Sequence, residues 1–288
     1  MKSYYCLNSS VQLGAYTLPN RLVITSKSRS LAHNNLPQPE AINYYTDKAT
    51  CGLIITEPTL VSPVHTLSNQ PGIYTHQQVR SWRKITESVR DKNGKIFLRL
   101  WYGEKIQHPI DNNIISLFRR AAQNALAADF DGVEICADFS DLIAHQSQYC
   151  SKEEDNQTQL LLSIIEEAAS VWDENKVGIE LPINSCFLKA KSSFLILMLY
   201  RLIDAFNFYN LAYLHIGKSF QNDVLQNKIS LMWLKSLHSI YSGTLIVNCQ
   251  NISQTEREKI CQYSQDLVSF YNLSKLPILD RLLDNLNV

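Results

Sequence analysis

Short apolar runs alternate along the chain with longer segments that are apolar on one face only, and the stretch Gly52–Tyr102 shows this best. Gly52–Glu57 and Ile96–Trp101 are apolar runs too short for a helix, which is typical of buried strands. The apolar face of the helical pattern between them comprises Val79, Trp82, Ile85 and Val89. Asn93-Gly94 ends this helix with a residue that tolerates a positive φ. The stretch therefore predicts a strand–helix–strand unit with parallel strands.

The same alternation continues over the whole chain and predicts eight strands, each followed by a helix. The predicted strands are Leu22–Thr25, Gly52–Glu57, Ile96–Trp101, Val133–Ala137, Val177–Leu181, Ala212–Ile216, Thr244–Val247 and Leu267–Phe270. The predicted helices are Glu40–Thr50, Val79–Val89, Ile115–Ala128, Gln159–Trp172, Phe194–Tyr209, Ser230–Tyr241, Thr255–Tyr263 and Leu276–Leu286. Eight such units define an α/β fold, the (β/α)₈ or TIM barrel, which commonly uses about 250 residues as one domain. We therefore expect residues 1–288 to form a single domain.

Four motifs in the first part of the chain carry a resemblance to a known family. They read LPNRLVI from Leu18, GLIITEPT from Gly52, PGIYTHQQVRSWRK from Pro71 and GKIFLRLWY from Gly94. These motifs resemble the old yellow enzyme family, the FMN-dependent ene-reductases of the NADH:flavin oxidoreductase group. The resemblance implies a flavin site at the C-terminal ends of the barrel strands, where barrel enzymes place their chemistry. It also implies a long lid after the third strand. Here Tyr102–Asn113 makes that connection directly, so we expect a shortened lid.

Several residues that the resemblance assigns to the flavin ring are changed. It implies a glutamine at Arg99 and an arginine at Glu180, both at the pyrimidine edge. A carboxylate at this edge repels the anionic reduced flavin. Because Arg99 and Glu180 have opposite charges, we expect an ion pair between them; the alternative is that both are solvated. Ser28 keeps a hydroxyl group that the resemblance implies, whereas Pro58 replaces a small residue against the ring and has no N–H.

The groups that the resemblance implies for catalysis and phosphate binding are also replaced. The residues in place of the substrate-binding His and Asn and the proton-donating Tyr are Cys136, Phe139 and Asp141. The residues in place of the phosphate-binding Gly-Gly and Gly-Arg pairs are Cys249, Gln250, Tyr271 and Asn272. Loss of such donors typically lowers catalytic rates by orders of magnitude. We therefore expect that the chain has lost FMN binding and ene-reductase activity, so no cofactor is predicted.

Three hypotheses remain for what the barrel does instead. In the first, the vacated pocket holds a small conjugated molecule for cofactor-free isomerisation or cyclisation. The candidate catalytic residues are Glu180, Arg99, Tyr102 and Asp138, and the candidate pocket residues are Ser28, Pro58, Trp101, Cys136, Phe139 and Tyr271. Cys136 is a candidate nucleophile, but a cysteine at a strand end is also a common small buried residue. The second hypothesis is a pseudoenzyme that acts through a protein partner. The third is an FMN-dependent NAD(P)H oxidoreductase with a rearranged site.

Composition narrows the classes of partner. The chain has 27 basic and 27 acidic residues, so no charge excess favours nucleic acid or an anionic membrane. Its seven cysteines lack CxxC spacing, and no two histidines have ligand spacing, so we expect neither a disulfide framework nor a metal site. The longest apolar run, Phe194–Tyr200, is too short to span a bilayer. We expect a reduced cytoplasmic protein with a small-molecule ligand; a protein partner or a homo-oligomer stays open.

Overall fold

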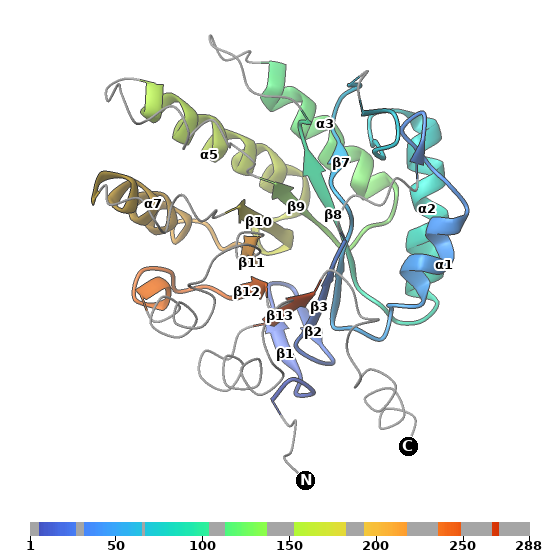
Figure 1. Cartoon of the computed structure of the whole chain (residues 1–288), viewed down its shortest axis with the longest axis horizontal. Helices are drawn as coiled ribbons and strands as arrows, with labels where there is room; N and C mark the ends of the chain where they lie inside the picture. Colours follow the sequence, from blue (N-terminus) through green and yellow to red (C-terminus); the bar gives the residue numbers. More distant parts are fainter. Residues whose placement is uncertain are drawn as a thin grey trace, which may run out of the picture.

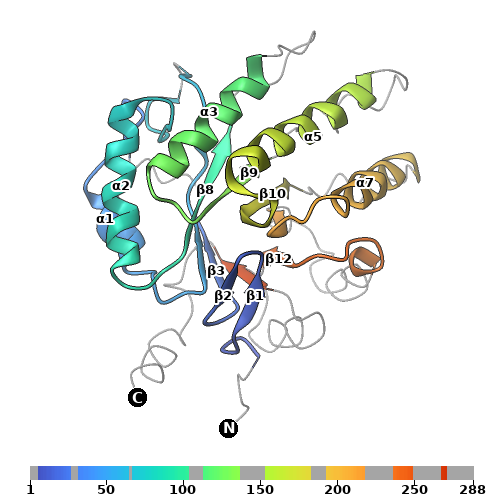
Figure 2. The same ribbon diagram turned by 180° about the vertical axis from the view of Figure 1, so that it is seen from behind.

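Eight parallel strands close into a barrel with helices on its outside (Figures 1 and 2). The structure is a computed structural model that describes residues 6–26, 32–64, 67–103, 113–136, 153–182, 193–217, 236–248 and 267–270. The barrel strands are, in order around the barrel, β3 (Leu22–Thr25), β6 (Leu53–Ile55), β8 (Ile96–Trp101), β9 (Gly132–Cys136), β10 (Val177–Pro182), β11 (Tyr213–Gly217), β12 (Leu245–Asn248) and β13 (Leu267–Phe270). Pairing of β13 with β3 closes the circle. The predicted barrel and all eight predicted strands are confirmed.

Five of the predicted helices lie in the described part of the chain and are confirmed. They are α1 (Glu40–Thr46), α2 (His76–Arg90), α3 (Asn113–Ala127), α5 (Glu153–Trp172) and α7 (Ser193–Phe206). The predicted end of the first helix is wrong, because the chain leaves the helix after Thr46 in a series of turns. Leu126 of α3 is a large apolar residue that is 49% exposed. The predicted helices Thr255–Tyr263 and Leu276–Leu286 lie outside the described residues, as does most of Ser230–Tyr241. Whether all 288 residues form one domain stays a prediction.

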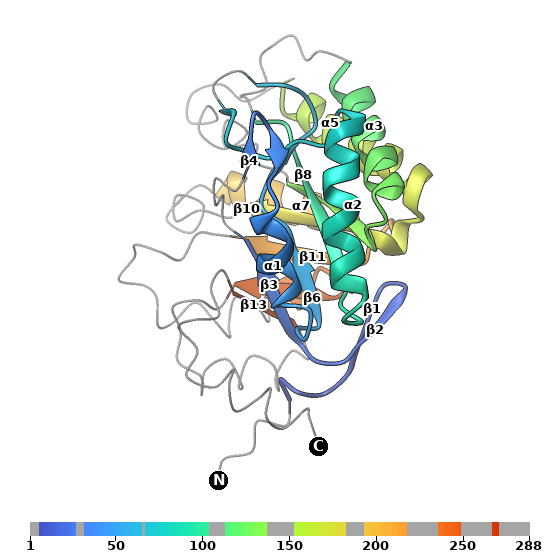
Figure 3. The same cartoon turned by 90° about the vertical axis from the view of Figure 1, so that its right-hand side faces the viewer.

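The sequence analysis did not predict two short hairpins, which lie at opposite ends of the barrel (Figure 3). The first, β1 (Val11–Leu13) with β2 (Tyr16–Leu18), closes the N-terminal end, and the Tyr16 hydroxyl donates to the Asp131 carbonyl just before β9. The second, β4 (Ala32–His33) with β5 (Leu36–Pro37), follows the C-terminal end of β3. Its two turn residues, Asn34 and Asn35, both have positive φ, which matches the turn type that two-residue hairpins prefer.

The lower part of the barrel interior is filled by two aromatic rings that lie over glycines. The Phe97 and Tyr213 rings are 5.8 Å apart between centroids, and both residues are fully buried. A Cβ atom at Gly132 would lie 2.5 Å from the Phe97 ring, and one at Gly178 would lie 2.2 Å from the Tyr213 ring. The glycines therefore provide the space for the rings. Together with apolar side chains of the β1–β2 hairpin, these rings separate the upper interior from solvent below.

Two observations bear on the expectations from composition. Cys6 is disulfide-bonded, so the expectation that all cysteines are reduced is wrong. Cys51 and Cys136 are thiols. In the part of the chain that the structure describes, no helix has the length and apolar character needed to cross a membrane.

We predict that Gly178→Ala destabilises the protein by about 2 kcal/mol or more, because its methyl group would overlap the buried Tyr213 ring. Urea denaturation measures this free energy of unfolding. In a Tyr213→Leu background the same change should cost clearly less, because the ring is absent. An equal cost in both backgrounds would show that the ring is not the cause.

Candidate active site

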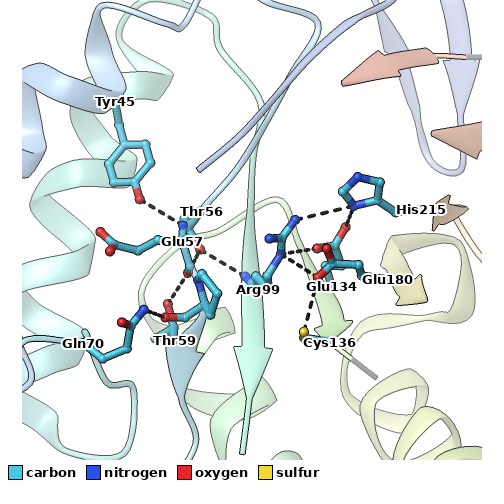
Figure 4. A network of polar contacts seen from close by, with 11 residues as sticks. Tyr45, Thr56, Glu57, Thr59, Gln70, Arg99, Glu134, Cys136, Glu180 and His215 are labelled. Atoms are coloured by element: carbon cyan, nitrogen blue, oxygen red, sulfur yellow. Dashed lines mark hydrogen bonds and ion pairs between the residues drawn. The ribbon is translucent and has the colours of Figure 1, made fainter. Parts of the chain in front are cut away.

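Four ionisable side chains gather inside the barrel (Figure 4). Strand register brings them together: Arg99 of β8 pairs with Glu134 of β9, and Glu180 of β10 pairs with His215 of β11. All four residues are buried. Glu180 is also in register with Cys136, the last residue of β9, which is partly exposed. We call these five residues the charged cluster.

Arg99 lies between two carboxylates of the charged cluster. Its Nε atom is 2.5 Å from Glu134 Oε1 and 3.4 Å from Glu180 Oε2. The ion pair that we expected between Arg99 and Glu180 is therefore present. The shorter contact, however, is to Glu134, which the sequence analysis did not single out. Breaking a buried pair on one side leaves an uncompensated charge, so the three side chains depend on each other.

His215 extends the charged cluster on the other side of Glu134. Its Nδ1 atom lies 2.9 Å from Glu134 Oε2. Because a carboxylate can only accept, Nδ1 carries the hydrogen and donates it. The cluster then has two carboxylates, one guanidinium and one imidazole, so its net charge is −1 with a neutral imidazole and zero with a protonated one.

The electrostatics of the charged cluster favour an ionised Glu134. Complete burial would by itself raise the pKa of Glu134, but the charges of Arg99 and His215 and their hydrogen bonds lower it to about 2. Burial and the nearby Glu134 carboxylate raise the pKa of Tyr213 well above its usual value. The Tyr213 hydroxyl is therefore a buried, protonated group beside the Glu134 carboxylate.

The backbone of Arg99 is held by the turn that follows β6. The Thr56 hydroxyl accepts a hydrogen bond from the Arg99 N–H at 3.0 Å and donates to the Glu57 carbonyl at 3.1 Å. The chain then turns at Pro58, whose carbonyl accepts from Gln70 Nε2 at 2.6 Å. The predicted strand Gly52–Glu57 is therefore shorter than expected, and a two-residue strand, β7 (Thr59–Leu60), resumes pairing with β8. Pro58 lies in this turn and not in the charged cluster.

The structure brings together only some of the predicted site residues. Arg99, Glu180 and Cys136 meet, and Cys136 Sγ donates to Glu180 Oε2 at 3.2 Å. Trp101 is the last residue of β8 and is partly buried. Tyr102 packs against the outer core, which includes Leu98 and Leu100, and its assignment to the site stays a prediction. The predicted site residues that lie outside the described part are Ser28, Asp138, Phe139, Cys249, Gln250, Tyr271 and Asn272.

Two members of the charged cluster, Glu134 and His215, were missed by the sequence analysis. A signal for both was present: alternation along β9 places Glu134 on the same face as Cys136, and alternation along β11 places His215 on the same face as Tyr213. Polar residues at such inward positions of predicted barrel strands are unusual enough to be noted. Among the described residues, no group of three His, Cys, Asp or Glu side chains is arranged to hold a metal ion.

A closed parallel barrel with ionisable side chains near the C-terminal strand ends defines the chain as a TIM-barrel protein. A model of the NADH:flavin oxidoreductase / NADH oxidase family matches residues 7–113. The old yellow enzyme of Trypanosoma cruzi has the same fold, with a TM-score of 0.78 and 25% sequence identity over 93% of this chain and 88% of that one. The chain is therefore similar to the NADH:flavin oxidoreductase family over residues 7–113, and it shares the fold of an old yellow enzyme.

The curated relatives match only part of their own length. 12-Oxophytodienoate reductase 1 of Oryza sativa subsp. japonica is 34% identical in an alignment of 161 positions that covers 43% of this chain and 42% of the relative. A 12-oxophytodienoate reductase-like protein of Solanum lycopersicum is 28% identical in an alignment of 214 positions that covers 59% of this chain and 60% of the relative. The chain thus spans less than two thirds of these relatives.

We predict that Glu134 makes stability depend on acid pH. Its pKa falls from 4.5 to about 2 on folding, so its contribution is fully present above about pH 4.5 and is lost as the pH falls towards 2. Between about pH 6 and about pH 3, the wild type should lose roughly 2 kcal/mol more unfolding free energy than Glu134→Gln. Urea denaturation at both pH values measures this difference. Parallel losses would contradict it, and Glu87→Gln, at an exposed position, should behave as the wild type does.

We also predict that Arg99→Met destabilises the protein by about 3–5 kcal/mol, because it leaves two buried carboxylates without their cation. Arg83→Met is the matched control, since Arg83 pairs with Glu87 at the surface, and should change stability by less than about 1 kcal/mol. Adding Glu180→Gln to Arg99→Met should restore part of the loss. Strictly additive effects in denaturant unfolding would show that the two side chains are not coupled.

Proposed function

We propose that this barrel has lost the FMN-dependent ene-reductase reaction and acts on a small conjugated molecule without a cofactor, by isomerisation or cyclisation. The observation that carries the proposal is the charged cluster, in which Arg99 contacts the carboxylates of Glu134 and Glu180. Arg99 and Glu180 stand at two of the positions that the resemblance assigns to the flavin.

The charged cluster does not fit a flavin that must be reduced. Reduced FMN carries a negative charge at its pyrimidine edge, and the resemblance implies an arginine there to stabilise it. Here that position is Glu180, a buried carboxylate. Two like charges about 4 Å apart repel each other by about 4 kcal/mol at the effective dielectric typical of protein sites. Arg99 does not remove this repulsion, because its charge is shared between two carboxylates.

The charged cluster does fit proton transfer. The Glu180 carboxylate accepts a hydrogen bond from the Cys136 thiol, and Cys136 lies at the partly exposed strand end. A base and a proton donor at this distance are what the isomerisation of a conjugated system needs, because the double bond moves or rotates without any net electron transfer. Such a reaction needs no flavin.

Similarity to the flavin oxidoreductases favours a second candidate function, an FMN-dependent oxidoreductase with a rearranged site. The matched relatives are named as 12-oxophytodienoate reductases, and the family model describes NADH:flavin oxidoreductases. In that case, groups other than Glu180 would have to stabilise the reduced flavin. A direct measurement of FMN binding separates the two candidates.

We predict that the purified protein is colourless and does not bind FMN stoichiometrically. Absorbance of the purified protein, followed by titration with FMN, measures this. The double variant Arg99→Gln/Glu180→Arg, which introduces the residues that the resemblance implies, should bind FMN at least about tenfold more tightly. In this variant, Glu134 remains available to pair with the new arginine.

The control is Arg83→Gln/Glu87→Arg, which makes the same two kinds of substitution at an exposed pair 3.5 Å apart and should leave FMN binding unchanged. Stoichiometric, yellow FMN binding by the wild type would contradict the proposed function and favour the oxidoreductase.

A further inference from the structure

We propose that Cys136 and Glu180 form a nucleophile–base pair that adds reversibly to α,β-unsaturated carbonyl compounds. The proposal rests on the proposed function, since it assigns the residues and the substrate class of the same site. It concerns covalent chemistry at the sulfur atom, which nothing in the family resemblance implies for this position.

The geometry of the pair is that of a thiol held by a base. Cys136 Sγ lies 3.2 Å from Glu180 Oε2, and the two residues are register partners on β9 and β10. Because an ionised carboxylate can only accept, the hydrogen belongs to sulfur. A nucleophile within hydrogen-bond reach of a base, which is itself oriented by a third group, is the usual arrangement for covalent catalysis.

Arg99 is the third group. Its Nε atom lies 3.4 Å from the same Oε2 atom that accepts from Cys136, and Glu134 holds Arg99 from the other side. Arg99 and Glu134 are therefore positioning residues that fix the direction of the Glu180 carboxylate. Glu180 is only 3% exposed, so solvent does not compete strongly for its oxygen atoms.

Tyr213 adds a hydroxyl group beside the charged cluster. It is fully buried, and burial together with the Glu134 carboxylate raises its pKa well above the usual value. The hydroxyl therefore stays protonated near neutral pH and is a hydrogen-bond donor inside the barrel.

The substrate class follows from the chemistry of sulfur. A thiolate is a soft nucleophile that reacts with the β-carbon of a conjugated carbonyl. As the S–C bond forms, the thiol proton passes to Glu180, and the π electrons of the double bond move to the α-carbon and carbonyl as an enolate. Rotation about the former double bond, followed by loss of sulfur and return of the proton to it, gives the cis–trans isomer. Atoms and electrons balance without an oxidant, a reductant or water.

The chain contains an internal control for thiol reactivity. Cys51 is also a thiol, but burial raises its pKa to about 12, and it has no base in a comparable position among its described contacts. Cys51 should therefore remain unmodified in the folded protein. Any general exposure of thiols by partial unfolding would modify both residues.

The first experiment measures the rate at which N-ethylmaleimide, a conjugated carbonyl probe, modifies Cys136 and Cys51 in the full-length protein, by peptide mass spectrometry. Cys136 should react at least about 100-fold faster than Cys51. Glu180→Gln should slow modification of Cys136 at least about tenfold, because the base is lost. If the carboxylate acted only through its charge, its removal would favour the thiolate and speed up the reaction, which would overturn the proposal. Glu87→Gln should leave the rate unchanged.

A second measurement on the wild type needs no variant. If Glu180 takes the proton, the rate at Cys136 should be nearly constant between about pH 6 and about pH 8. A rate that rises about tenfold per pH unit would show attack by a free thiolate and would overturn the proposal.

The isomerisation itself is tested with diethyl maleate as the probe. The wild type should convert it to diethyl fumarate, observed by proton NMR, and Cys136→Ser should not. Adduct formation at Cys136 without any fumarate would overturn the isomerisation step. All of these readouts are independent of flavin. Tight FMN binding would contradict the proposed function but would leave the thiol modification rates unchanged. Slow modification of Cys136 would overturn the nucleophile–base pair but would not imply that the protein binds FMN.

Discussion

The position of the Arg99 guanidinium between the carboxylates of Glu134 and Glu180 is the interaction on which the site depends. A guanidinium buried this deeply is stable only with partners, and a buried carboxylate is equally costly without one. The charges of Arg99 and Glu180 therefore depend on each other. Arg99 together with an arginine at position 180 would leave an excess of positive charge, and Glu180 together with a glutamine at position 99 would leave two carboxylates without a cation. The barrel interior tolerates either excess poorly. The two positions at which the resemblance implies other residues are therefore linked by one interaction.

The lower half of the barrel makes this interaction stronger. The Phe97 and Tyr213 rings over Gly132 and Gly178 fill the interior below the charged cluster and keep water away on that side. In such surroundings, each charge interacts with its neighbours more strongly than it would in water. The same dry floor explains why Glu134, in spite of full burial, keeps a pKa of about 2: Arg99 and His215 act on it at short range.

The fold could be predicted from the sequence because strand and helix periodicities are strong in this chain, but the site could be predicted only in part. Arg99 and Glu180 could be predicted because the resemblance assigns their positions to the flavin. It assigns no such role to Glu134 and His215, so these two residues were not predicted. The β1–β2 hairpin was missed because two three-residue strands with one buried side chain each leave too short a pattern. The Thr56 hydroxyl that fixes the Arg99 backbone has no sequence signature, since it depends on the register of β6 and β8.

The replacement at position 180 changes the kind of chemistry that the barrel mouth favours. A positive side chain there stabilises negative charge that accumulates on a bound group, which suits electron transfer to a flavin. A carboxylate at the same place disfavours such charge and accepts protons instead, and its hydrogen bond from Cys136 supplies the proton. Arg99 and Glu134 contact each other, and Arg99 contacts this carboxylate, so the proposed use of the barrel interior for proton transfer depends on these same contacts.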